Sequence, residues 1–328
     1  MSKSVKLAAA VERMLALGHT TMASAEDLKV VASFSIIADL AKNVGGDRVA
    51  ITTLVGPHGD AHVYEPKPAD AAAVAAAGVI LINGLQFEGF LERLVEASGT
   101  KAPIAEISKG AELIPNTEDA HHDEGSEVQA GTQGEEAGGG QAQRDEDGDD
   151  HGGFDPHAWQ SVPNTEIYVR NIADAFCGAD PAGCETYKAN AQSYEATLRA
   201  LDSEIKAAIS AIPEGKRVII TSHDAFGYFQ HEYGITFLAP EGISTESEAS
   251  AADIGSLIKQ VREDKASAIF VENITNPRLV EQIASETGLR VGGQLYSDAL
   301  SEEGGPADTY VSLMRHNVNT IKGAILGN

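Results

Sequence analysis

The chain has 328 residues, of which 42% are hydrophobic and 5% aromatic, and its formal net charge at pH 7 is −25. This length suits two lobes better than one hydrophobic core. The acidic excess argues against nucleic acid and anionic membranes as partners, and no apolar stretch approaches the ~20 residues of a membrane span.

The first residues resemble a secretory signal. Lys3 and Lys6 precede an apolar stretch, and small residues end the segment at Ala25, which predicts a signal peptide over residues 1–25. Glu12 interrupts the apolar stretch, so the pattern is imperfect. No cysteine lies near the expected cleavage point, which disfavours a lipid-anchored form. We therefore expect a free periplasmic protein.

From residue 28 onwards, apolar strand-like runs alternate with helical stretches. The first half predicts strands over residues 28–34, 48–54, 78–84 and 102–108, and helices over residues 35–46, 68–78 and 89–99. The second half predicts strands over residues 217–222, 235–239, 267–272 and 289–296, and helices over residues 224–233, 250–264, 276–287 and 306–325. Helices between successive strands imply parallel pairing. The predicted fold is α/β, with two lobes that each hold a four-stranded parallel sheet flanked by helices.

The middle of the chain breaks this alternation. Residues 116–153 are rich in Gly, Glu, Asp and Gln and almost free of apolar residues, which predicts an acidic, mobile loop. A helix over residues 164–176 follows, and then a long one over 181–212, which spans about 45 Å and would join the lobes. We expect an N-terminal lobe over residues 26–178, a linking helix over 179–212 and a C-terminal lobe over 213–328.

The two cysteines of the chain are close together in the sequence. Cys177 and Cys184 flank six residues that include Gly178, Pro181 and Gly183, which favour a turn. This pattern predicts a disulfide, and a disulfide fits an oxidising compartment. The alternative is that the cysteines are two small buried apolar residues.

Four residues of metal-ligand type stand just beyond four strand-like parts of the chain: His62, His157, His223 and Asp298. Ligands of open parallel sheets bind beyond the carboxyl ends of the strands. Three imidazoles and one carboxylate form a complete shell for tetrahedral Zn²⁺. We therefore predict one metal site between the lobes. Taken singly, each residue also has a structural explanation without a metal, because a loop histidine is usually solvated and an aspartate after a strand often caps a helix.

Several motifs then carry a family resemblance. The segments HVYEPKPAD, DPHAW, SHDAFGYF, GISTESEAS and LYSDALS occur in this order, and with them the chain resembles the cluster A-I periplasmic solute-binding proteins of metal ABC transporters. The resemblance runs from about residue 28 to the C-terminus. It implies two lobes joined by one long helix, and delivery of zinc or manganese to an inner-membrane ABC permease.

The resemblance also implies the metal positions, which fall on the same His62, His157, His223 and Asp298. The manganese branch has a glutamate at the third position, whereas the imidazole of His223 suits Zn²⁺ better. The acidic insertion before His157 likewise resembles the zinc branch. The expected function is that of a monomeric, non-enzymatic periplasmic zinc-binding protein. Asp298 is the least certain ligand, since some zinc-branch members use water or a glutamate as the fourth.

Other polar residues around these motifs have open roles. His58 could be a surface residue, a transfer group or an alternative ligand. Asp60 and Glu65 are candidates for orienting an imidazole. Glu246 and Glu248 lie in a family-like motif without an assigned role.

The acidic loop has three interpretations. It could be an inert insertion, it could capture zinc weakly through His121, His122 and His151, or it could be docked by a periplasmic zinc metallochaperone. Two other functions compete with metal transport as a whole. A zinc hydrolase would need an open coordination position and a general base, and the chain has no HExxH motif. A metal-binding surface adhesin is the third class.

Overall fold

The computed structural model describes residues 27–116, 153–247 and 249–327. The predicted signal peptide, residues 117–152 of the acidic loop with its histidines His121, His122 and His151, and Glu248 lie outside the described residues. No helix in the described ranges is long and apolar enough to cross a membrane.

The first sheet is formed by the N-terminal part of the chain. Its strands are β1 (Leu28–Phe34), β2 (Val49–Val55), β3 (Val79–Ile82) and β4 (Ile104–Glu106), all parallel and in the order β2-β1-β3-β4. The last five residues of β1 are buried, as expected for a strand covered on both faces. Helices α1 (Ser35–Gly45), α2 (Pro68–Ala75) and α3 (Leu91–Ser98) connect the strands.

The second sheet repeats this arrangement in the C-terminal part. Strands β5 (Val218–Ile220), β6 (Thr236–Leu238), β7 (Ala268–Glu272) and β8 (Val291–Leu295) are parallel and lie in the order β6-β5-β7-β8. Its helices are α6 (Gly227–Tyr233), α7 (Ala251–Asp264), α8 (Arg278–Thr287) and α9 (Tyr310–Leu326). The predicted α/β fold with two four-stranded parallel sheets is therefore confirmed. We call the two halves the N-terminal and C-terminal lobes.

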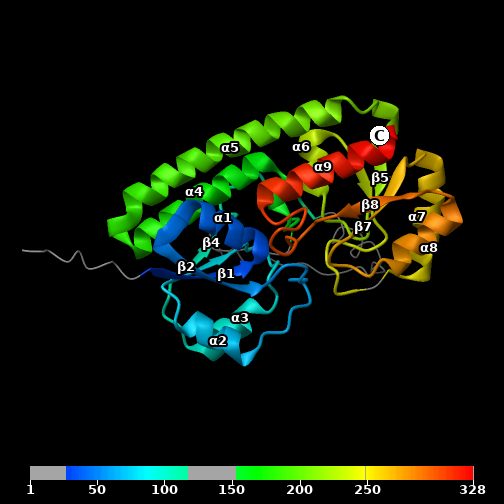
Figure 1. Cartoon of the computed structure of the whole chain (residues 1–328). Coiled ribbons are helices and arrows are strands. Elements are labelled where there is room, and N and C mark those ends of the chain that lie inside the picture. The colour runs from blue at the N-terminus through cyan, green and yellow to red at the C-terminus, as the bar shows by residue number, and fades with distance from the viewer. Residues whose placement is uncertain (1–26, 117–152, 248, 328) are drawn as a thin grey trace, which may run out of the picture.

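Helix α4 (Val162–Ala179) packs against the N-terminal lobe, and the long α5 (Cys184–Ser210) joins the lobes and runs across both of them beside α9 (Figure 1). Helix α4 begins two residues earlier than predicted because Ser161 caps its first turn. The side chain of Asp180 caps a separate short turn at Pro181–Gly183, so α5 starts at Cys184. A disulfide between Cys177 and Cys184 closes this corner, as predicted.

The lobes share one hydrophobic core. The main cluster of buried side chains runs from β1 through Trp159 and Tyr168 to Leu198 on α5 and Tyr310 on α9. Trp159 also donates a hydrogen bond from Nε1 to the carbonyl of Ser297 (3.0 Å), which joins the two lobes directly. Because apolar packing is continuous across the boundary, the described structure favours small movements of loops over wide separation of the lobes.

Candidate metal site

The four predicted ligands come from four different loops that meet between the sheets. His62 lies in the loop after β2, and His223 and Asp298 lie three residues beyond β5 and β8. His157 immediately precedes the short turn Ala158–Gln160 that leads into α4. The fold brings residues up to 236 positions apart in the sequence (298 − 62) to one place.

The four side chains converge on one centre. One ligand-type atom from each lies within 4.8 Å of those of the others. Oδ2 of Asp298 is 3.4 Å from Nε2 of His62, 3.7 Å from Nε2 of His157 and 3.2 Å from Nε2 of His223. His157, His223 and Asp298 are fully buried, and His62 is 9% exposed. All three rings therefore turn the same nitrogen toward one carboxylate oxygen.

A carboxylate holds His157 from behind. Oδ1 of Asp155 lies 2.7 Å from Nδ1 of His157 and also accepts the backbone N–H of the same residue (2.9 Å). Since a carboxylate only accepts hydrogen bonds, Nδ1 carries a hydrogen, and the neutral form of the ring has its lone pair on Nε2, facing the centre. Tyr228 of the C-terminal lobe donates to the carbonyl of Asp155 (2.7 Å), which fixes this segment across the lobe boundary.

A second carboxylate lies against the ring of His223, at ion-pair distance. Oε2 of Glu272 lies 2.7 Å from Nδ1 of His223, and Oε1 accepts the backbone N–H groups of Ser222 and His223 (2.8 and 2.9 Å). Glu272 ends strand β7 and is buried. A buried glutamate needs such partners, so its position at the end of an apolar strand is a signal that sequence reasoning missed. In the sequence, Asp155 was named only as part of the segment DPHAW.

The charges in this cluster shift one another's protonation. Burial lowers the pKa of His157, but the negative charges of Asp298 and Asp155 outweigh it and raise that pKa to about 9. Burial is likewise outweighed for His223, where Glu272 and Asp298 raise the pKa well above its usual value. Burial raises the pKa of Asp298, and the two imidazoles bring it well below its usual range. The centre therefore attracts positive charge, carried either by protons or by a cation.

Several polar atoms at the centre have no hydrogen-bond partner among the described residues: Nε2 of His62, Nε2 of His157 and Oδ1 of Asp298. Buried polar atoms are nearly always satisfied, so a group of unsatisfied ones facing a common point requires an explanation. A cation at the centre would bind the two ring nitrogens and the carboxylate of Asp298, whose Oδ2 faces them. The donor set of three imidazoles and one carboxylate has the chemistry that zinc sites use.

The other polar residues named from the sequence lie outside this centre. His58 is exposed, with its ring 6.1 Å from that of Tyr296. Glu65 is also exposed. Asp60 contacts the backbone of His62 and not its ring, because its Oδ1 accepts the N–H of that residue (2.9 Å). The carboxylates that contact imidazole nitrogens from behind are Asp155 and Glu272.

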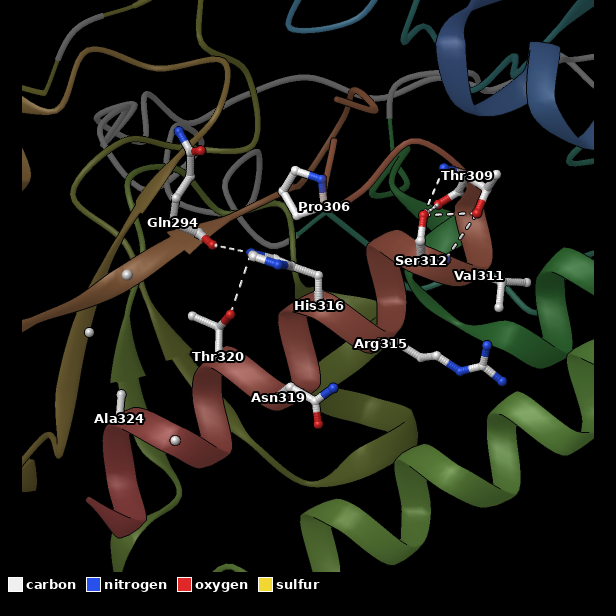
Figure 2. Close-up of a pocket in the computed structure, with 13 residues that line it drawn as sticks. Gln294, Pro306, Thr309, Val311, Ser312, Arg315, His316, Asn319, Thr320 and Ala324 are labelled. Carbon is white, nitrogen blue, oxygen red and sulfur yellow. Dashed lines mark hydrogen bonds between the residues drawn. The ribbon is translucent and has the colours of Figure 1, made fainter. Parts of the chain in front are cut away.

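A separate cavity of about 790 Å³ lies between β8 and α9, away from the four converging residues (Figure 2). His316 projects across it and donates from Nε2 to the carbonyl of Gln294 (2.9 Å). Helix α9 lies so close to β8 that a Cβ at Gly292 would stand 2.7 Å from the Cβ of Ala324. The glycines of β8 are thus explained by packing against α9.

The matching family model is described as "Zinc-uptake complex component A periplasmic" (ZnuA) and covers residues 30–324. The chain belongs to this family of periplasmic metal-binding proteins of ABC transporters. The expected cluster A-I resemblance is therefore confirmed at the level of the family. A place in its zinc branch stays a prediction.

Curated relatives cover almost the whole chain. The manganese-binding lipoprotein MntA of Bacillus subtilis is 34% identical over 92% of this chain and 90% of its own length. The iron-binding protein YfeA of Yersinia pestis is 33% identical over 91% of this chain and 86% of its own. Both relatives are named for binding a metal ion, and neither is named as an enzyme or an adhesin, so the comparisons do not favour the hydrolase or the adhesin.

Solved structures agree with the fold. The periplasmic zinc-binding protein TroA of Treponema pallidum matches with a TM-score of 0.76 at 27% identity, covering 92% of this chain and 99% of that one. The manganese-bound periplasmic metal-binding protein of Candidatus Liberibacter asiaticus matches with a TM-score of 0.72 at 29% identity, covering 92% and 100%. Relatives of similar likeness thus carry the names of different metals, and overall likeness does not decide the ion.

Proposed function

We propose that this protein binds Zn²⁺ outside the cytoplasm and delivers it to the permease of an ABC transporter, with His62, His157, His223 and Asp298 as ligands. The observation that carries the choice of zinc is the imidazole of His223 at the third position. Together with two further imidazoles it forms a nitrogen-rich donor set, whereas Mn²⁺ favours oxygen donors. The disulfide between Cys177 and Cys184 supports an oxidising compartment such as the periplasm.

The charges around the centre support a divalent ion. Asp298, Asp155 and Glu272 together carry −3 when ionised, so an ion of +2 leaves −1 with neutral imidazoles. Without an ion, protons must balance the charge of the three buried carboxylates. Asp298 is a better candidate than water for the fourth ligand, because its Oδ2 already lies within 3.7 Å of all three Nε2 atoms.

The proposal includes the predicted domain boundaries and a monomeric state. Boundaries at residues 178 and 212 fit two lobes bridged by α5. Weak capture of zinc by the acidic loop, and its docking by a metallochaperone, concern residues outside the described ranges. They stay predictions.

The identity of the ion is tested by metal analysis of the protein isolated from its own cellular compartment without added metal. One zinc per chain is expected, with manganese and iron at trace levels. Isolation from cells matters because most nitrogen and oxygen sites bind Zn²⁺ more tightly than Mn²⁺ in vitro, whichever ion they carry in the cell. A preparation that contains mainly manganese or iron would contradict the zinc assignment while leaving the metal site intact.

The carboxylate behind His223 gives a second prediction. Glu272→Gln keeps the size of the side chain and one acceptor oxygen but removes the negative charge beside Nδ1 of His223. Zinc affinity is expected to fall about 10- to 100-fold, as for other residues that orient a metal ligand, when measured by chelator competition. Glu263→Gln is the control, because Glu263 lies exposed on α7 of the same lobe. Equal affinities of the two variants would contradict the orienting role of Glu272.

A further inference from the structure

A cavity of about 210 Å³ reaches the candidate metal site from one side. His62 is the one residue of the four that lines it, in agreement with its 9% exposure against 0% for the other three. Phe87 of the N-terminal lobe forms part of its wall, and Ile243, Ser244 and Glu246 of the C-terminal lobe form another part. An ion that reaches the centre through this cavity passes His62 first.

A hydrogen bond joins the two walls at this point. Oγ1 of Thr245, which lies between the cavity residues Ser244 and Glu246, donates to Oδ2 of Asp60 (2.6 Å). The other oxygen of the same carboxylate accepts the backbone N–H of His62 (2.9 Å). One carboxylate thus connects a loop of the C-terminal lobe, 185 residues away in the sequence, to the backbone of a predicted ligand.

The three other ligands are held differently. A buried carboxylate lies directly behind the ring of His157 and of His223. Asp298 is fully buried, and the carbonyl of the residue before it, Ser297, accepts hydrogen bonds from Trp159 and Gln160 (3.0 and 2.8 Å). His62 instead depends on Asp60 acting through the backbone. It is therefore the ligand whose position follows the C-terminal loop most directly.

We propose that the hydrogen bond between Thr245 and Asp60 is a latch that positions His62 and sets the rate at which the ion leaves through this cavity. This inference rests on the proposed metal-binding function. With the hydroxyl in place, the loop at residues 243–246 closes the cavity and Asp60 holds His62 toward the centre. Without it, the loop moves away, His62 turns from the ion first, and the cavity widens beside the vacated position.

The test compares Thr245→Val, which keeps the shape of the side chain but removes the hydroxyl, with Thr245→Ser, which keeps the hydroxyl. The full chain is loaded with one Zn²⁺, and its release to excess chelator is followed by stopped flow. Release from Thr245→Val is expected to be about tenfold faster than from the unmodified protein, the scale of one hydrogen bond to a charged group. Thr245→Ser should stay close to the unmodified protein.

A readout without metal separates positioning from general stability. The thermal unfolding midpoint of metal-free Thr245→Val is expected to fall by only a few degrees, since it loses one hydrogen bond at a partly exposed loop, and that of Thr245→Ser should stay close to the unmodified protein. Unchanged release from Thr245→Val, equally fast release from both variants, or metal-free Thr245→Val that is already unfolded at the assay temperature would overturn the proposal. Failure of the unmodified protein to bind Zn²⁺ would instead overturn the proposed function, so the two outcomes are distinct.

Discussion

Replacing His223 with alanine is expected to abolish stoichiometric zinc binding at micromolar protein concentration. The variant loses one of three imidazoles. It also leaves the buried carboxylate of Glu272, which lies 2.7 Å from the ring in the unmodified protein, without that partner. Removing a residue that only orients a ligand costs about 10- to 100-fold in affinity, so removal of the ligand itself should cost more. Titration calorimetry and metal analysis after dialysis measure the loss.

The matched control for this experiment is His231→Ala. His231 is an exposed histidine on α6 of the same lobe, outside the four converging residues. The His231→Ala variant should bind one zinc per chain with unchanged affinity. Because His223 is buried, circular dichroism must show that the His223→Ala variant is folded before its binding is judged. A folded His223→Ala protein that still took up one zinc per chain with unchanged affinity would contradict the ligand set.

The sequence was a good guide to the fold and to the four converging residues. Strands of this chain are apolar runs bounded by turn residues, and residues 28–34 were predicted with the bounds that β1 has in the structure. Placement of His223 and Asp298 just beyond strands followed from the geometry of parallel sheets. The structure brings them within reach of His62 and His157, and their binding of an ion stays a prediction until it is measured.

The supporting contacts could not be predicted because they depend on tertiary structure. Glu272 and His223 are 49 residues apart, and only the pairing of β5 with β7 brings them together. Asp60 and Thr245 come from different lobes, so no local pattern relates them. Helix ends also moved by two or three residues where a cap such as that of Ser161 or Asp180 decided them.

The shared core bears on how the site opens. Pulling the lobes apart would expose side chains such as Trp159 and Tyr310, both fully buried, at a cost of about 2 kcal/mol or more for each. Movement of the loop at residues 243–246 exposes much less apolar surface and breaks one hydrogen bond to Asp60. Local opening at His62 is therefore the less costly route for an ion to enter and leave.

Zinc affinity is expected to rise steeply between pH 7 and pH 9. In the metal-free protein the pKa of His157 is raised to about 9, and that of His223 also lies well above its usual value. Both rings are therefore expected to be positively charged imidazolium at pH 7. The ion must displace these protons, because only neutral imidazole binds a metal. Each displaced proton makes the affinity fall about tenfold for every pH unit below the ring's pKa.

The stability of the metal-free protein should change with pH in the opposite direction. A histidine whose pKa is raised by folding contributes stability that is fully present below about pH 6.5, its usual pKa, and is lost as the pH rises through about 9. Metal-free protein is therefore expected to unfold at lower temperature at pH 9 than at pH 7, while zinc-bound protein is not.

The protons released on zinc binding can be counted by calorimetry in buffers of different ionisation enthalpy, and at least one per ion is expected at pH 7. Affinity that stays constant from pH 7 to pH 9, with no proton released, would show that the rings are already neutral and that the carboxylates behind them do not hold protons at the site.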